Sequence, residues 1–282
     1  MFVTVFFAIS GMVLYHNYSN YFLLKAFYFN RWKAIFPAYY LCLLYFFYHT
    51  VKFKKVFYIG NKYRLLLALI GKDCYFGIGE WFLGEIIIIY ILYPLILIIF
   101  KKNIIILPIL LISTYIWLIN FFEINKKRNI TICLLSFYFG IVTKKYCLDK
   151  KYYALASSII LHIILIYVKI PSFKYKVFIH LIQGFSLYLI LMHLAKYVME
   201  TKVNIIFKEI SKLSFCIYLF HHKIILEMKG IIDENKWSNS IINIGVIILI
   251  TLMKAKILYI TTNSLFQWYY FKKVEEYFKN IY

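Results

Sequence analysis

Acidic residues are scarce in this chain of 282 residues. Asp and Glu number 12 against 33 Lys and Arg, and the aspartates are Asp73, Asp149 and Asp233 alone. The absence of a D-x-D cluster argues against a metal-dependent glycosyltransferase, because a hard cation needs carboxylate oxygens. G-x-S-x-G and G-x-x-x-x-G-K-[ST] are also absent, so the sequence indicates neither an elbow-serine hydrolase nor a P-loop ATPase.

Cysteine is sparse and irregularly spaced. The five cysteines form no C-x-x-C pair, so neither a metal site nor a disulfide framework is predicted. The first fifteen residues are apolar but lack the charged region and the A-x-A-like cleavage site of a signal peptide. We therefore expect them to form a helix that begins abruptly.

Apolar residues, by contrast, dominate. They make up 63% of the chain, and aromatic residues make up 21%, whereas an ordinary soluble domain is about 45–50% apolar. Apolar runs of about 17–25 residues are long enough to cross a hydrocarbon core of roughly 30 Å. Nine segments stand out by hydropathy: 1–15, 34–50, 81–100, 104–122, 130–143, 152–168, 177–198, 213–228 and 240–260. The predicted fold class is all-α, a polytopic transmembrane bundle of about nine helices.

The connections between these segments are mostly short, so neighbouring helices are expected to form antiparallel hairpins. We predict one membrane domain over residues 1–265 and a charged tail, residues 266–282, at the headgroups or in solvent. A segment around residues 65–70 is too short to cross the bilayer and is expected at the interface. Basic residues are divided almost equally between alternate loops, so the positive-inside rule does not decide the orientation.

The net charge of +21 does not point to nucleic acid. The lysines lie between apolar runs and near their ends, and they form no separable basic segment. Anionic lipid headgroups are the simpler partner. A nucleotide bias of the genome is a further explanation for part of this positive charge, because the whole chain is rich in Ile, Lys, Tyr and Asn.

The first forty residues carry the first informative pattern. An F-F-x-x-S-G sequence ends at Gly11, and small residues such as Ser10 and Gly11 let two helix backbones approach closely. A short basic connection leads to Arg31 and Lys33, which are expected at a membrane surface. Pro37 is expected early in the following helix, where its missing N–H costs little.

A second pattern begins at Trp81 and includes Glu85. An ionised carboxylate is unfavourable in hydrocarbon. Near a helix start, Glu85 is expected either to face a wet cavity or to lie at the interface, where the positive helix N-terminus stabilises it. Position alone favours the interface.

The third pattern consists of Ser214, Tyr218 and His221, at positions i, i+4 and i+7 of one helix stripe. Because lipid offers no hydrogen-bond partners, these groups are expected to face the bundle or a cavity. For Ser214 and Tyr218 we favour a structural role, since such groups can join helices by hydrogen bonds.

Other histidines also fall within predicted spans: His162, His180 and His193. An intramembrane histidine is a functional candidate by default. His180 and His193 are 13 residues apart, a spacing that does not place them on the same face of an ideal helix. For each of these histidines taken singly we favour a structural role, with its hydrogen bonds satisfied within the bundle or at the interface.

The first pattern resembles two signatures of the acyltransferase-3 family of integral-membrane O-acyltransferases, F-F-x-x-S-G on one helix and R-R-x-x-R-I-x-P-x-Y at the start of the next. The first signature matches without a gap. The second matches at Arg31, Ile35, Pro37 and Tyr39. Asn30 and Ala34 replace two of its arginines, and Lys33 supplies a displaced cation.

The other two patterns are similar to family signatures in the same order. Trp81, Tyr90 and Pro94 fall at the spacing of a W-x-L-x-x-E helix, whereas Glu85 comes one residue early, a turn of about 100° around the helix. Residues 214–221 resemble S-Y-x-x-Y-L-x-H, with Phe215 in place of the first Tyr.

The resemblance implies an enzyme of a bacterial plasma membrane that transfers an acyl group, by expectation acetyl, from acyl-CoA to a hydroxyl of a cell-surface glycan. Such a reaction needs a base, a donor for the oxyanion and cations for the phosphates of the donor. Arg31 and Lys33 are the candidates for the phosphates, and Glu85 and His221 for catalysis. No permanently bound cofactor or metal is expected, and the resemblance places the Arg31 loop in the cytoplasm.

In the family, the base is a histidine on a helix that precedes the F-F-x-x-S-G helix, and we expect that element to be missing here. His16 follows the signature and is not its equivalent. Three explanations stay open: a start upstream of Met1, a shortened and inactive relative, or a base role for His221 or His222. The alternative function is a non-catalytic carrier or flippase for polysaccharide intermediates.

Overall fold

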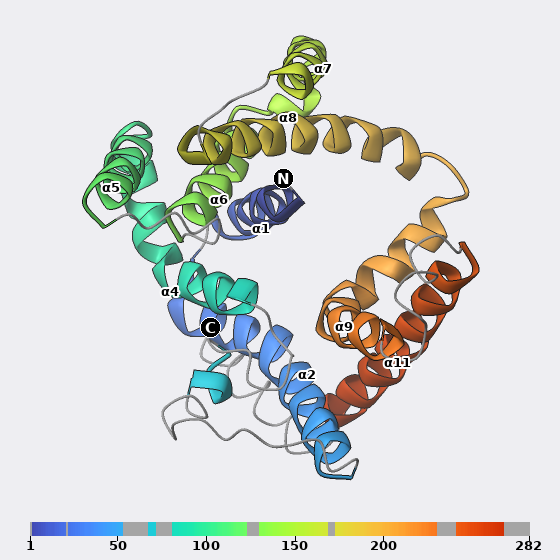
Figure 1. Cartoon of the computed structure of the whole chain (residues 1–282). Coiled ribbons are helices and arrows are strands. Elements are labelled where there is room, and N and C mark those ends of the chain that lie inside the picture. Colours follow the sequence, from blue (N-terminus) through green and yellow to red (C-terminus); the bar gives the residue numbers. More distant parts are fainter. Residues whose placement is uncertain are drawn as a thin grey trace. The chain divides into compact units, whose positions relative to one another are not determined.

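The computed structural model describes residues 2–20, 22–52, 67–71, 81–122, 130–168, 173–229 and 241–267 (Figure 1). In these ranges the chain is helical and contains no strand, which confirms the all-α prediction. The helices are α1 (Phe2–Tyr18), α2 (Leu24–Lys52), α4 (Trp81–Lys102), α5 (Ile106–Phe122), α6 (Ile130–Lys145), η1 (Leu148–Lys150), α7 (Tyr152–Tyr167), α8 (Phe173–Met199), α9 (Asn204–Lys229) and α11 (Ile241–Gln267).

Several of these helices suit a membrane. By length and composition, three stretches of the described chain can cross a bilayer: Trp81–Lys102, Val177–Met199 and Asn243–Gln267. Shorter apolar helices accompany them at Phe2–Tyr18, Ile106–Trp117 and Tyr152–Tyr167. Apolar helices suit this environment because they satisfy their backbone hydrogen bonds internally.

Each of the nine predicted segments corresponds to an α-helix, but two helices begin well before their apolar runs. α2 starts at Leu24 and α9 at Asn204, because a helix continues beyond the apolar run that hydropathy detects. Arg31 and Lys33 therefore lie within α2, and the short connection expected before them ends earlier. The prediction that Pro37 lies early in its helix is wrong, since Pro37 is inside α2.

The chain folds as two compact units, each assembled from separate stretches of sequence. The first unit contains residues up to Phe22 and Ile88–Asn204, and the second contains Leu23–Ile87 and Ile205–Tyr282. The predicted tail begins within the last two residues of α11, and its residues 268–282 lie outside the described residues.

The first unit is built around close contacts of α1 with α6 and α8, which Figure 1 shows beside it. Gly11 of α1 meets α6 so closely that an added Cβ would lie 2.0 Å from the carbonyl oxygen of Phe137. A Cβ at Gly140 of α6 would lie 1.8 Å from the carbonyl oxygen of Ala8. The two helix backbones are therefore in contact at paired glycines, one on each helix.

The second unit pairs α2 with α11. The Lys33 ammonium lies 5.0 Å from the centre of the Phe266 ring, and the Lys254 ammonium lies 5.6 Å from the centre of the Tyr45 ring. Because the residue numbers rise on α2 as they fall on α11, the two helices run antiparallel.

A short helical turn, residues 67–71, packs against α2 and the beginning of α4 within the second unit. The hydroxyl of Tyr39 donates to the carbonyl oxygen of Ala68, and that of Tyr40 donates to the carbonyl oxygen of Leu69 at 3.0 Å. Gly71 ends this turn with a φ of 78°, in the left-handed region, and packs closely under Leu83 and Ile87 of α4. Glycine suits this position because a side chain would be strained there and would meet Ile87.

Substitution of Gly140 by Ala is expected to destabilise the first unit. The added methyl group would overlap the α1 backbone, and overpacking of this kind costs about 1–3 kcal/mol. Gly140→Ala should therefore unfold at a lower temperature than the parent in detergent, with loss of helix followed by circular dichroism.

Gly245→Ala in α11 is the matched control. A Cβ at Gly245 meets nothing within 4 Å, and Ala is favoured over Gly in a helix interior by about 1 kcal/mol. Its unfolding temperature should equal or exceed that of the parent. Equal effects of the two substitutions would contradict the glycine contact.

Candidate functional site

The second unit contains most of the sequence-predicted site residues. Arg31 and Lys33 on α2, the beginning of α4, and the Ser214 to His221 stripe on α9 all belong to it. Segments about 130 residues apart in sequence are thus collected in one compact unit. Ser10 and Gly11 belong to the first unit.

His221 on α9 is held in one tautomer by its own helix. Its Nδ1 atom lies 2.6 Å from the carbonyl oxygen of Tyr218. A carbonyl oxygen can only accept a hydrogen bond, so Nδ1 carries the proton in the neutral ring and Nε2 has the lone pair. The half-buried His221 ring is therefore prepared to accept a proton at Nε2.

Ring contacts join the beginning of α4 to the same turn of α9. The rings of Phe82 and Tyr218 are 5.1 Å apart, and those of Tyr218 and His221 are 5.6 Å apart. Phe82 is almost fully buried, which makes this contact part of the packed interior. Aromatic pairs at such distances stabilise a contact beyond the area that they bury.

Glu85 lies three residues after Phe82, and His221 lies three residues after Tyr218. Positions three apart on a helix share a face, so both candidate catalytic residues lie about one helical turn from the Phe82–Tyr218 contact. Glu85 is half-buried, and its Oε2 atom is buried. Its position just after the first turn of α4 also suits a carboxylate, because the helix N-terminus is positive.

The basic pair lies farther away along α2. Arg31 is half-buried with a buried Nε atom, and Lys33 lies over the ring of Phe266. Tyr45, 14 residues after Arg31 and about 21 Å along the helix, contacts Phe220, the neighbour of His221, with ring centres 5.6 Å apart. Arg31 and Lys33 therefore lie near the beginning of α2, whereas His221 of α9 lies close to the second half of α2.

One of the predicted residues differs from the expectation. Ser214 is exposed, so it does not face the interior as its stripe predicts. The exposed residues Lys208, Glu209 and Lys212 precede it on α9, which shows that the first half of this helix is a surface segment. Ser10 donates its hydroxyl to the carbonyl oxygen of Phe6 on its own helix at 3.0 Å.

Three histidines of the first unit have polar contacts of their own. His162 Nδ1 lies 2.8 Å from the Ser186 hydroxyl, and His180 Nδ1 lies 3.0 Å from the side-chain oxygen of Gln183. His193 is buried, with Nδ1 2.9 Å from the carbonyl oxygen of Leu189. Among the described residues, no group of three or more His, Cys, Asp or Glu side chains is placed to hold a metal ion.

Two charged residues that the sequence analysis did not select also lie in the second unit. Lys254 of α11 and Glu227 of α9 approach each other at 3.9 Å, and Lys254 stands with Lys256 near the middle of a mainly apolar helix. The signal that could have found them is a charge within an apolar span, since ionisable residues there are rare and usually functional.

A comparison with models of protein families identifies the family of this chain. The model of an acyltransferase domain, that of the acyltransferase-3 family, matches residues 1–256. No curated protein and no solved structure matches the chain. The matched range includes every candidate residue named above, from Ser10 to Lys254, and most of the chain, so this membrane protein belongs to the acyltransferase-3 family.

Proposed function

We propose that this membrane acyltransferase moves an acyl group, acetyl by resemblance, from acyl-CoA to a hydroxyl of a cell-surface carbohydrate. The observation that carries the proposal is the contact of His221 Nδ1 with the Tyr218 carbonyl oxygen, which leaves the Nε2 lone pair about one turn from the Phe82–Tyr218 contact. A neutral imidazole is a suitable general base near neutral pH.

In the proposed reaction, the acceptor hydroxyl oxygen attacks the thioester carbonyl carbon while its proton passes to His221 Nε2. The carbon–sulfur bond then breaks, an ester forms, and the leaving thiolate takes up the proton. Nδ1 keeps its own proton and donates a hydrogen bond to the Tyr218 carbonyl oxygen throughout.

Arg31 and Lys33 are proposed to hold the phosphates of the donor. Cations form strong, charge-assisted hydrogen bonds with phosphate oxygens. Their separation from the His221 region along α2 suits a long donor, with phosphates at one end and the reacting acyl group at the other. This geometry would be unsuitable for a small activated acyl donor, which could not reach both groups.

Loss of the base should lower the rate of acyl transfer. General-base catalysis contributes about 10²- to 10⁴-fold, so His221→Ala should reduce kcat by at least about 100-fold. The assay uses the purified chain in liposomes with labelled acetyl-CoA and a soluble glycan acceptor. His222→Ala is the matched control on the next residue and should leave kcat close to the parent value.

An equal loss in both histidine variants would remove His221 from the base role. If the parent chain transfers no acyl group but moves a lipid-linked glycan across the liposome membrane, the carrier alternative replaces the enzyme. Two measurements in the same liposomes distinguish the enzyme from the carrier. Label on the acceptor reports acyl transfer, and accessibility of the glycan reports its movement across the membrane.

Loss of the arginine should weaken donor binding more than the chemical step. A hydrogen bond to a charged group contributes about 1.5–3 kcal/mol, which corresponds to about 10- to 150-fold in affinity. Arg31→Gln should therefore raise KM for acetyl-CoA by about this factor with a small change in kcat.

Lys25→Gln is the control for Arg31→Gln. Lys25 is an exposed cation near the beginning of the same helix, so its loss reports the general effect of charge. A Lys25→Gln variant with the same rise in KM, or an Arg31→Gln variant with unchanged KM, would show that Arg31 does not hold the donor.

A further inference from the structure

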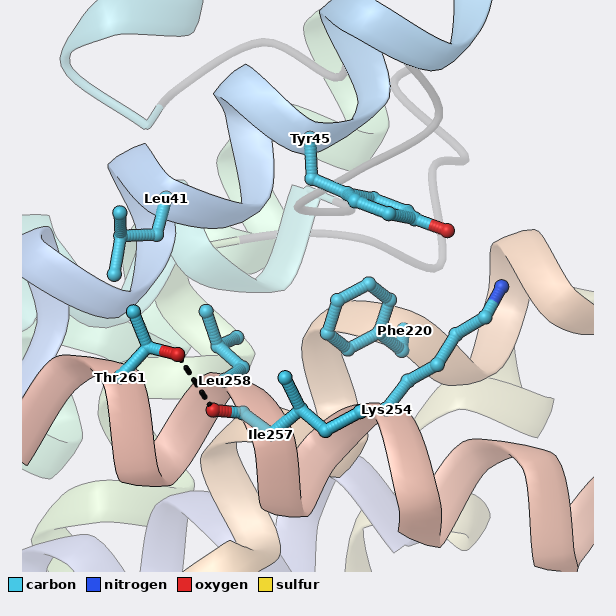
Figure 2. Close-up of a pocket in the computed structure, with 7 residues that line it drawn as sticks. All are labelled: Leu41, Tyr45, Phe220, Lys254, Ile257, Leu258 and Thr261. Carbon is cyan, nitrogen blue, oxygen red and sulfur yellow. Dashed lines mark hydrogen bonds between the residues drawn. The ribbon is translucent and has the colours of Figure 1, made fainter.

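A groove lies among three helices of the second unit, α2, α9 and α11. It has a volume of about 420 Å³, within the range of pockets that hold small ligands. Its lining consists mainly of apolar side chains, shown in Figure 2: Leu41, Tyr45, Phe220, Lys254, Ile257, Leu258 and Thr261. Apolar cavities tend to exclude water, so a hydrocarbon chain is a better occupant than a polar solute.

The two ends of this groove differ in polarity. In Figure 2 the Lys254 ammonium and the Tyr45 hydroxyl point toward one end, whereas Leu41 and Thr261 lie at the other. Thr261 adds little polarity there, because its hydroxyl donates to the carbonyl oxygen of Ile257 at 2.9 Å. The groove therefore matches an amphiphile with one polar or anionic end and an apolar chain.

The charge at the polar end favours an anion. The Lys254 ammonium lies 5.6 Å from the centre of the Tyr45 ring and 3.9 Å from the Glu227 carboxylate. The second distance exceeds the roughly 2.7–2.9 Å of a charge-assisted hydrogen bond. An ammonium has three donors, so Lys254 can bind an anionic oxygen while Glu227 offsets part of its charge.

The polar end also lies toward the ends of two helices. Glu227 comes two residues before the last residue of α9, and Tyr45 comes seven residues before the last residue of α2, which is about 3 Å and 10 Å along their axes. Lys254 itself lies near the middle of α11. A lysine can extend its ammonium toward lipid headgroups while its stem stays in apolar surroundings. Lys33, the cation of the proposed donor site, lies over Phe266 near the other end of the α2–α11 pair.

We infer that this groove binds an anionic phospholipid of the surrounding bilayer. One acyl chain lies against Leu41, Phe220 and Leu258, and the phosphate meets Lys254 beside Tyr45. The bilayer supplies both parts of this ligand, and anionic headgroups are attracted by basic residues near the membrane surface. The inference does not depend on the proposed function, because neither Arg31 nor His221 takes part in it.

The test measures lipid binding to the purified full-length chain after delipidation, by native mass spectrometry. Phosphatidylglycerol and phosphatidylcholine with identical chains are the probes. The parent should prefer phosphatidylglycerol, and Lys254→Gln should weaken that binding about fivefold, the change that corresponds to about 1 kcal/mol per basic residue at an anionic membrane surface.

Lys256→Gln is the matched control, because Lys256 is an exposed cation two residues further along α11. It should leave phosphatidylglycerol binding unchanged. Leu258→Trp, which fills the groove, should weaken the binding of both lipids. Glu227→Gln should strengthen phosphatidylglycerol binding, and this gain can be measured even where Lys254→Gln does not fold.

Three results would overturn the inference: equal affinity for the two lipids, equal losses in the Lys254 and Lys256 variants, or no gain in Glu227→Gln. Palmitate and inorganic phosphate serve as further probes. Binding of palmitate that depends on Lys254, without binding of phosphatidylglycerol, would assign the groove to a free fatty acid and overturn the phospholipid. If inorganic phosphate competes with phosphatidylglycerol and palmitate does not, the groove is an anion site that holds no acyl chain, and the inference is overturned.

Discussion

The lack of hydrogen-bond partners in hydrocarbon governs the polar groups of this protein. Hydroxyls within its helices donate to carbonyl oxygens one turn earlier on the same helix, as Thr143 does to Phe139 and Thr251 does to Ile247. Such bonds satisfy a polar side chain without a partner from another helix. The bond between His221 and Tyr218 belongs to the same class. In this case the constraint also determines which ring nitrogen can act as a base.

Cations in the second unit are stabilised by aromatic faces. Lys33 lies over Phe266 and Lys254 over Tyr45, and a ring quadrupole attracts a cation most strongly where water is scarce. Antiparallel α2 and α11 thus carry one basic site near one end and another near the middle of α11. In the proposals above, the first serves a phosphate-bearing donor and the second a lipid, so a single helix pair keeps two anionic ligands apart.

Hydropathy located the helices well because membrane helices are long and apolar. It failed at the beginnings of α2 and α9, where polar residues continue the helix. The same error placed Pro37 near a helix start and left Arg31 outside the helix. Periodicity also predicted an inward stripe on α9 that Ser214 does not follow, because spacing defines a face but not the neighbour that covers it.

The sequence by itself determined the all-α membrane class, the family and the order of the three motif blocks, because these depend on composition and local spacing. Tertiary structure alone decided that Phe82 meets Tyr218, which brings the turns of Glu85 and His221 to one contact. It also paired Gly11 with α6 and Lys254 with Glu227. These pairings join residues far apart in the chain, and they depend on how helices pack, which local patterns do not encode.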